Sequence, residues 1–321
     1  MRQNRRNFLK NLTLISAGTA FVPTFVTSLT ACINSDDIFF DISLAEWSLN
    51  KALFDGKLTN MKFPEVAKNE FGIDAVEYVN QFFSDKAKDK AYLSELNQRC
   101  SDLGVKQLLI MVDDEGDLAV TDDTDRQKAI ENHYKWIEAA NYLGCHSIRV
   151  NLFGDGPKSE QKAASVDSLG QVAEFGKDAN VNVLVENHGG YSSDAQWLAD
   201  VMKQVNMDHC GTLPDFGNFC IKREGGARWE APCIEEYDKY KGVKELMSFA
   251  KGVSAKSYGF DENGSETTID YRKMLRIVHD AGYHGYIGIE YEGGEENGGA
   301  YQGIRSTKKL LQRVGKEIAE Q

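Results

Sequence analysis

One apolar run in the chain, residues 181–194 (VNVLVENHGGYSSD), ends abruptly in polar residues and then in two glycines. Alternation along a strand would place Leu184, Glu186 and His188 on one face of this run and its valines on the other. Apolar positions from 197 to 205 then recur at helical spacing. A strand, a polar tip, a glycine turn and a helix form half of a βαβ unit.

The same unit recurs along the rest of the chain. Apolar runs predict seven further strands, at residues 39–49, 73–80, 105–112, 146–153, 211–215, 252–258 and 286–291. Helical periodicity lies between these runs, and glycines at 72, 104, 144 and 282 mark helix ends. Residues 216–251 form a longer insertion with a helical stretch of its own. Eight strand–helix alternations predict a single-domain (β/α)₈ TIM barrel, an α/β fold, over residues 39–321.

The first 31 residues are predicted to be a twin-arginine and lipoprotein signal peptide. Residues 4–10 (NRRNFLK) match the twin-arginine export pattern apart from their first residue, and a mildly apolar stretch follows. Residues 29–32 (LTAC) resemble a lipoprotein processing box, which predicts a lipidated Cys32 and a short tether over 32–38. The alternative, a membrane-spanning anchor, is disfavoured because Ser, Thr, Gly and Pro dilute the apolar run. Both interpretations place the domain outside the cytoplasm, held at a membrane.

The net charge limits the possible partners, and the cysteine content limits the possible disulfides and metal sites. The formal charge is −12, and it becomes −16 without residues 1–31, which hold four basic and no acidic residues. Such a surface repels phosphate backbones, so no nucleic-acid partner is expected. Apart from Cys32, an odd number of cysteines remains at irregular spacings, namely Cys100, Cys145, Cys210, Cys220 and Cys233. This pattern predicts buried free thiols rather than disulfides or a zinc site.

Four predicted strands end in charged residues that share the parity of their inward-facing neighbours. These residues are Glu186, Asp215, Lys256 and Glu290. The C-terminal ends of all barrel strands open on one rim, so the four side chains are expected to converge. Three carboxylates in one place repel each other unless a cation neutralises them. Oxygen ligands favour Mg²⁺ or Mn²⁺, and a nearby imidazole such as His188 would favour Mn²⁺ or another transition metal, such as Zn²⁺ or Co²⁺.

Four segments together resemble the xylose isomerase-like TIM-barrel family, which includes sugar isomerases, sugar epimerases, inosose-handling enzymes and endonuclease IV. They are VEYVN at 76–80, LVENHGG at 184–190, DFGNF at 215–219 and IGIEYEG at 287–293, and the resemblance covers nearly all of 41–314. It implies that Glu186, Asp215 and Glu290 bind the metal. Where the family usually has His-x-Lys on the seventh strand, this chain has Ser254-Ala255-Lys256, so that imidazole ligand is missing. Either the site is weaker, or water or His188 completes it.

The resemblance also implies roles in proton transfer. Glu186 and Glu290 are the expected acid–base pair, flanking a substrate whose carbonyl the metal polarises. Lys256 is expected to hydrogen-bond the developing enolate oxygen as a cation, or to donate a proton if its pKa is lowered.

Further polar side chains at the strand ends are candidates for substrate binding. They are His188, Asn218, Arg149 and Glu77. A structural role is the alternative for His188, and Glu77, Arg149 and Asn151 could instead pair with one another. Trp47 and Trp229 are candidates for stacking on a sugar, although aromatic residues at loop ends more often pack against the protein.

Export favours an unphosphorylated substrate, and the acidic run at 290–296 would repel a phosphate. The first hypothesis is a metal-dependent isomerase or epimerase that acts on an unphosphorylated sugar, keto-sugar or cyclitol through an enediolate. The second is a β-eliminating enzyme that cleaves 3-keto-glycosides. The third is a lipoprotein that binds sugars without catalysis. The expected partner is a small carbohydrate, with membrane attachment only through Cys32, and a homo-oligomer is compatible with all three.

Overall fold

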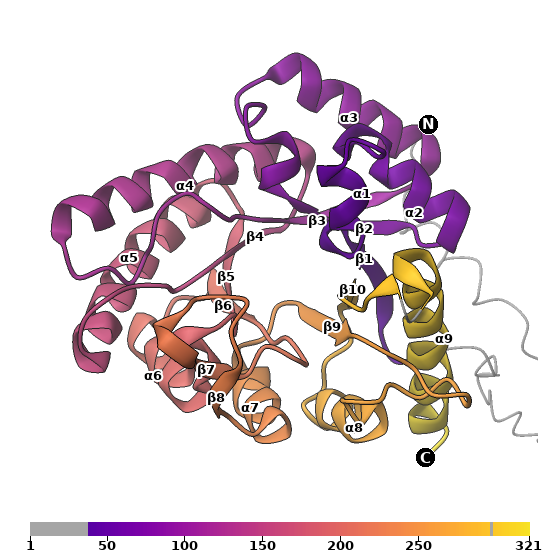
Figure 1. Cartoon of the computed structure of the whole chain (residues 1–321). Helices are drawn as coiled ribbons and strands as arrows, with labels where there is room; N and C mark the ends of the chain where they lie inside the picture. Colours follow the sequence, from indigo (N-terminus) through magenta and orange to yellow (C-terminus); the bar gives the residue numbers. More distant parts are fainter. Residues whose placement is uncertain (1–37, 296–297) are drawn as a thin grey trace, which may run out of the picture. The chain divides into compact units, whose positions relative to one another are not determined.

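Eight parallel strands form one curved sheet in the computed structural model, which describes residues 38–295 and 298–321 (Figure 1). Their order is β6-β5-β4-β3-β2-β1-β10-β9. The strands are β1 Asp41–Ala45, β2 Ala75–Val79, β3 Lys106–Met111, β4 Ser147–Val150, β5 Asn182–Glu186, β6 Cys210–Leu213, β9 Val253–Ser257 and β10 Tyr286–Tyr291. Two parallel bridges, Thr212 to Ala250 and Asp215 to Ser254, join the two edges of this sheet. The predicted (β/α)₈ barrel is therefore confirmed.

Helices surround the sheet on its outer side (Figure 1). They are α1 Asn50–Phe54, α2 Phe63–Phe71, α3 Lys90–Leu103, α4 Asp123–Leu143, α5 Lys158–Asp178, α6 Ala195–Val205, α7 Lys239–Leu246, α8 Tyr271–Asp280 and α9 Gly299–Ala319. Gly72, Gly104 and Gly144 follow α2, α3 and α4 with φ of 60°, 64° and 76°. This left-handed conformation suits glycine and ends each helix where the sequence predicts. The predicted signal peptide and the tether up to residue 37 lie outside the described residues, in which no helix is long and apolar enough to cross a membrane.

The first predicted strand is shorter than its apolar run. After β1 the chain turns into a 3-10 helix, Glu46–Leu49, instead of staying extended to residue 49. The hydroxyl of Ser48 donates to the carbonyl of Ile289 (3.1 Å) and accepts from the amide of Tyr291 (3.0 Å). These bonds attach the turn to β10 at the rim.

Two apolar cores lie on opposite faces of the strands, one inside the barrel and one outside it. A small inner core holds Ala45, Val79, Leu109, Met111, Leu184 and Leu213, whereas a larger one fills the space between strands and helices. Leu184 faces inward and the β5 valines face outward, as strand alternation predicts. The carboxylate of Glu77 also lies inside, where a β-carbon at Gly288 would come within 2.6 Å of its Oε1. A larger residue at 288 would require the Glu77 carboxylate to move.

The insertion after β6 corrects the prediction for the cysteines. It begins with an antiparallel hairpin, β7 Cys220–Arg223 and β8 Cys233–Glu236, and the two cysteines form a disulfide. The prediction of free thiols is wrong for this pair, because hairpin pairing brings together residues that are 13 apart in sequence. The hairpin buries little apolar surface, and a covalent link compensates for that. Cys100 and Cys145 are buried free thiols, and Cys210 is free and half-buried.

Candidate active site

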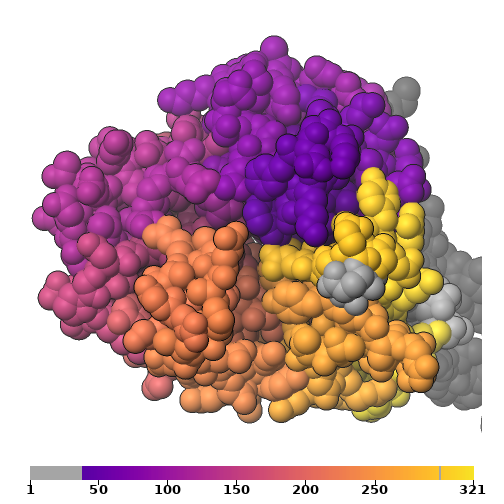
Figure 2. All heavy atoms as spheres, viewed as in Figure 1, coloured from indigo at the N-terminus to yellow at the C-terminus, as the bar shows by residue number. Residues whose placement is uncertain are grey.

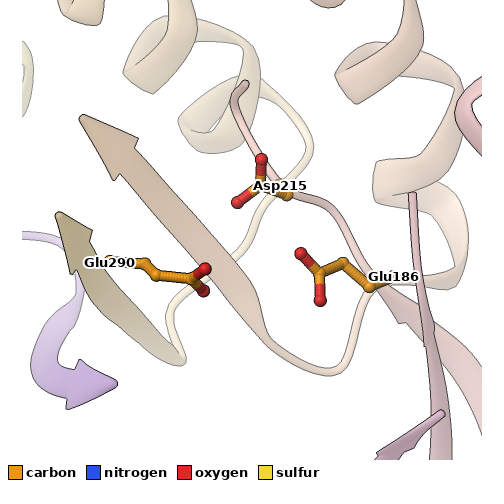
Figure 3. Close-up of side chains that lie close together, drawn as sticks. All are labelled: Glu186, Asp215 and Glu290. Atoms are coloured by element: carbon orange, nitrogen blue, oxygen red, sulfur yellow. The ribbon is translucent and has the colours of Figure 1, made fainter. Parts of the chain in front are cut away.

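Three carboxylates meet at the C-terminal ends of the strands (Figure 3). Glu186 is the last residue of β5, Asp215 comes two residues after β6, and Glu290 is the fifth residue of β10. One oxygen from each lies within 4.8 Å of the others, and all three side chains are buried. We call Glu186, Asp215 and Glu290 the carboxylate cluster. The structure brings together the three residues for which the sequence predicts a metal site.

The environment of the carboxylate cluster fits a hard divalent cation. Burial raises the pKa of Asp215 to about 6 and that of Glu186 to about 7, and it also raises the pKa of Glu290. The Oε2 atom of Glu186 accepts no hydrogen bond although it is buried. Within the described residues no histidine or cysteine joins the cluster, so its donors are all oxygens. Such a set suits Mg²⁺ or Mn²⁺ better than softer metals.

Ser254 and Lys256 link two of these carboxylates from β9. The Oγ atom of Ser254 lies 2.6 Å from Oδ2 of Asp215 and 3.2 Å from Oε2 of Glu290. A hydroxyl thus stands at the position where the resemblance in sequence would imply an imidazole. The Nζ atom of Lys256 forms an ion pair with Glu290 and lies 3.8 Å from Asp215 and 3.2 Å from Oε1 of Glu292.

Lys256 is a buried cation. Burial opposes its charge, but the carboxylates of Asp215, Glu290 and Glu292 outweigh burial and raise the pKa of Lys256 well above its usual value. The direction of this shift agrees with a fixed positive charge and not with a lowered pKa, and the role of Lys256 in the reaction stays a prediction.

Arg149 supports Glu186 from the neighbouring strand, β4. Its Nη1 donates to Oδ1 of Asp113 (2.7 Å), and its Nε lies 2.9 Å from Oε2 of Glu186. The contact between Nε and Oε2 is an ion pair and not a hydrogen bond, and neither atom has another hydrogen-bond partner. On the other side of Glu186, Nδ2 of Asn218 donates to Oε1 (3.0 Å). Arg149 and Asn218 therefore hold the side chain of Glu186 in place.

Asp113 is a residue of this site that the sequence reasoning missed. It accepts from Arg149 and also from Nδ2 of Asn151 (2.6 Å), and Oδ1 of Asn151 lies 2.8 Å from Nδ1 of His188. Arg149 and Asn151 thus meet through Asp113. The sequence could have indicated Asp113, because this residue directly follows the apolar run 105–112 and so stands at the end of a predicted strand.

The remaining candidate, Glu77, lies deeper inside the barrel than the rim. Its Oε1 accepts from the hydroxyl of Ser43 (2.6 Å), and its Oε2 has no hydrogen-bond partner. Burial raises the pKa of Glu77 to about 7. Glu77 does not pair with Arg149 or Asn151 by a hydrogen bond or salt bridge, so the predicted three-residue group does not form.

His188 stands apart from the carboxylate cluster. Burial, aided by the charge of Arg149, lowers the pKa of His188 to about 4, so its imidazole is neutral. Its ring lies 4.7 Å from that of Trp229, centre to centre. His188 does not replace the missing metal ligand of the seventh strand, and contact with substrate stays a prediction.

A cavity of about 600 Å³ reaches the carboxylate cluster at Glu290. Its lining includes Glu290, Glu292, Arg149, Asn218 and His188, and it has the size of a small-molecule site. Figure 2 shows the face of the molecule hollowed at the centre of the barrel, beside the orange residues of the insertion. Glu290 is the member of the carboxylate cluster that lines this cavity, so a monosaccharide placed here would face Glu290.

Several known proteins resemble this chain. A D-tagatose 3-epimerase-like protein has a TM-score of 0.65 and 16% identity, covering 88% of this chain and 99% of that chain. The IOLI protein, whose structure contains a bound zinc atom, has a TM-score of 0.65 and 15% identity over 87% of this chain and 99% of its own. At such low identities the likeness shows the fold alone.

The 3'-dehydrocarminate deglycosidase alpha subunit of Microbacterium sp is 36% identical over 75 residues, which are 23% of this chain and 22% of that protein. The chain thus matches less than a quarter of this relative's length. A model of the family described as xylose isomerase-like TIM barrel matches residues 65–310. The fold, the position of the carboxylate cluster and this match agree, and the chain belongs to the xylose isomerase-like TIM-barrel family.

Proposed function

We propose that the chain is a metal-dependent isomerase or epimerase that removes a proton next to the carbonyl of an unphosphorylated sugar, keto-sugar or cyclitol. One observation carries this proposal: three buried carboxylates lie together, and one of them, Glu290, lines a sugar-sized cavity. Barrel enzymes hold their reacting groups at this rim. Membership of the xylose isomerase-like family supports the same class of reaction.

The side chains of the site suit an acid–base pair. Glu186 has a pKa raised to about 7 by burial, which suits a group that takes and returns a proton near neutral pH. Glu290 faces it across the carboxylate cluster (Figure 3). Glu186 would take the proton on one side of the substrate and Glu290 would return one on the other. Lys256 would stabilise the negative charge that develops on the enolate oxygen.

A divalent cation fits the oxygen atoms of Glu186, Asp215 and Glu290. When bound, it would polarise the substrate carbonyl and lower the cost of forming the enolate. The all-oxygen donor set favours Mg²⁺ or Mn²⁺, with Zn²⁺ or Co²⁺ as alternatives.

A second candidate function is the β-eliminating cleavage of 3-keto-glycosides. The similarity to a deglycosidase subunit favours it, although it covers only a short segment. In this reaction the base takes the proton beside the keto group. The electron pair then expels the substituent on the next carbon. Both candidates begin with the same proton transfer, and they differ in whether the glycosidic bond breaks.

We also propose that the protein is exported and attached to a membrane through a lipidated Cys32. The motifs of residues 4–10 and 29–32 support this location. The Cys220–Cys233 disulfide supports it independently, because disulfides persist mainly in oxidising compartments. Sugar phosphates and chromosomal DNA are rarely met there, which favours unphosphorylated sugars.

Proton exchange in deuterated water tests the proposed function. The purified protein with Mn²⁺ is incubated with unphosphorylated sugars, keto-sugars and 3-keto-glycosides, and deuterium at the carbon next to the carbonyl is measured by mass spectrometry. We expect exchange with wild type and with the exposed-site control Glu295→Gln, and none with Glu186→Gln or Glu290→Gln. Release of the aglycone would support the second candidate. Sugar binding without any deuterium exchange would contradict the proposed catalysis and indicate a protein that only binds sugars.

A further inference from the structure

The loop between β7 and β8 places two large side chains in the catalytic cavity. Arg228 and Trp229 line the same cavity as Glu290. Trp229 is 42% exposed, an unusual degree for an indole beside a buried site. Ile234, on β8 of the same hairpin, is also exposed, but it does not line this cavity. The loop thus presents an accessible aromatic surface on the side where substrate would bind.

Three rings form a corner at this point, and we call Phe153, His188 and Trp229 the aromatic corner. The ring of Trp229 lies 4.7 Å from that of His188, and it meets Phe153 nearly edge to face at 5.5 Å. His188 follows Glu186 by two residues, so the aromatic corner adjoins the carboxylate cluster along the chain. The cavity lining thus includes both the aromatic corner and Glu290.

The aromatic corner is held by contacts from three directions. Both nitrogens at the end of Arg228 donate to the carboxylate of Asp117 (2.6 and 3.2 Å), and its guanidinium lies 4.3 Å from the centre of the Phe153 ring. The Cys220–Cys233 disulfide links the two strands that carry the loop. A site ordered before binding loses less entropy when a ligand arrives, which favours a role in recognition.

We propose that the aromatic corner binds a second ring, attached to the reacting sugar, that stacks through one face on Trp229. Glu290 and the exposed Trp229 line the same cavity, so a ring joined to a sugar that reacts at Glu290 would stack on the indole. The natural ligands would then be glycosides that carry an aryl ring or a second pyranose, rather than free monosaccharides. The inference rests on the proposed function, since it assumes that the sugar reacts at the carboxylate cluster.

Affinity ratios of three 3-keto-glucosides test the inference. Methyl, phenyl and glucosyl derivatives are titrated by calorimetry into the full chain made inactive by Glu290→Gln. We expect the phenyl or the glucosyl compound to bind about 3- to 10-fold more tightly than the methyl compound, the range for an aromatic stacking contact. A phenyl preference identifies an aryl substituent, and a glucosyl preference identifies a second sugar.

Substitutions on the hairpin decide whether Trp229 is responsible. Trp229→Ala should reduce the ratio to about 1, Trp229→Phe should keep part of it, and the matched control Ile234→Ala should leave it unchanged. Equal affinity for all three compounds, or a ratio that survives Trp229→Ala, overturns the inference. Deuterium exchange into the methyl compound, catalysed by the wild type, tests the proposed function separately. A failure of the proposed function can therefore be distinguished from a failure of the inference about Trp229.

Discussion

Replacing Lys256 with methionine is expected to expose the electrostatic cost of the carboxylate cluster. The ammonium group of Lys256 is fully buried, and it touches Glu290 and lies 3.8 Å from Asp215 and 3.2 Å from Glu292. Methionine keeps most of the side chain's length and loses the charge. Removing one partner of a buried ion pair costs about 3 to 5 kcal/mol, because the other partner stays buried and uncompensated. For a domain of this size that corresponds to a fall in melting temperature of roughly 10 °C.

The sign of the pH dependence follows from the carboxylates. Burial raises the pKa of Asp215 to about 6 and that of Glu186 to about 7, and loss of the ammonium group would raise both further. At pH 5 the carboxylates of the folded variant would be protonated, so the cost of the substitution should be small. At pH 8 the cost should be at its largest. The carboxylates must then either stay charged without the ammonium group or take up protons from a solution that contains few.

Urea unfolding with a chelator present, at pH 5 and pH 8, measures this cost. Lys128→Met, on the exposed face of α4, is the matched control and should change the free energy of unfolding by less than about 0.5 kcal/mol. Adding Mn²⁺ should restore part of the stability of the Lys256 variant, because a bound cation replaces the lost charge. A loss at pH 8 no larger than that of the control would refute the reasoning.

Two further changes follow from other parts of the structure. Burial raises the pKa of Glu46 to about 8, so its carboxyl takes up a proton on folding, and the free energy of unfolding should fall from pH 5 to pH 8. Glu46→Gln should flatten this pH profile, measured by urea unfolding. A slope equal to that of the wild type would contradict this account. Ser254→His should restore an imidazole beside Asp215 and shift metal preference towards Zn²⁺ in competition dialysis, whereas a preference equal to that of wild type would show that Ser254 does not face the metal.

Much of the fold was predictable because it depends on local patterns. The glycines after α2, α3 and α4 mark helix ends in the sequence and adopt the left-handed conformation in the structure. Alternation on β5 fixed which face of the strand is inside the barrel. The carboxylate cluster was predictable for the same reason, since each of its members interrupts an apolar run near a strand end.

Features that depend on distant contacts were not predictable. The Cys220–Cys233 disulfide requires the pairing of two short strands whose sequence lacks a clear alternating pattern. The partner of His188 is Asn151, 37 residues earlier, and it meets the imidazole only when β4 and β5 lie side by side. The raised pKa of Lys256 likewise reflects carboxylates from two other parts of the chain, so composition alone left its direction open.

Metal-dependent proton exchange tests the central claim most directly. Wild type is treated with a chelator, assayed for deuterium uptake into an unphosphorylated keto-sugar, and assayed again after Mn²⁺ is returned. We predict that uptake stops without metal and resumes with it, and that Asp215→Asn abolishes both the recovery and the binding of Mn²⁺ measured by electron paramagnetic resonance. Uptake at an undiminished rate in the metal-free protein would contradict the account.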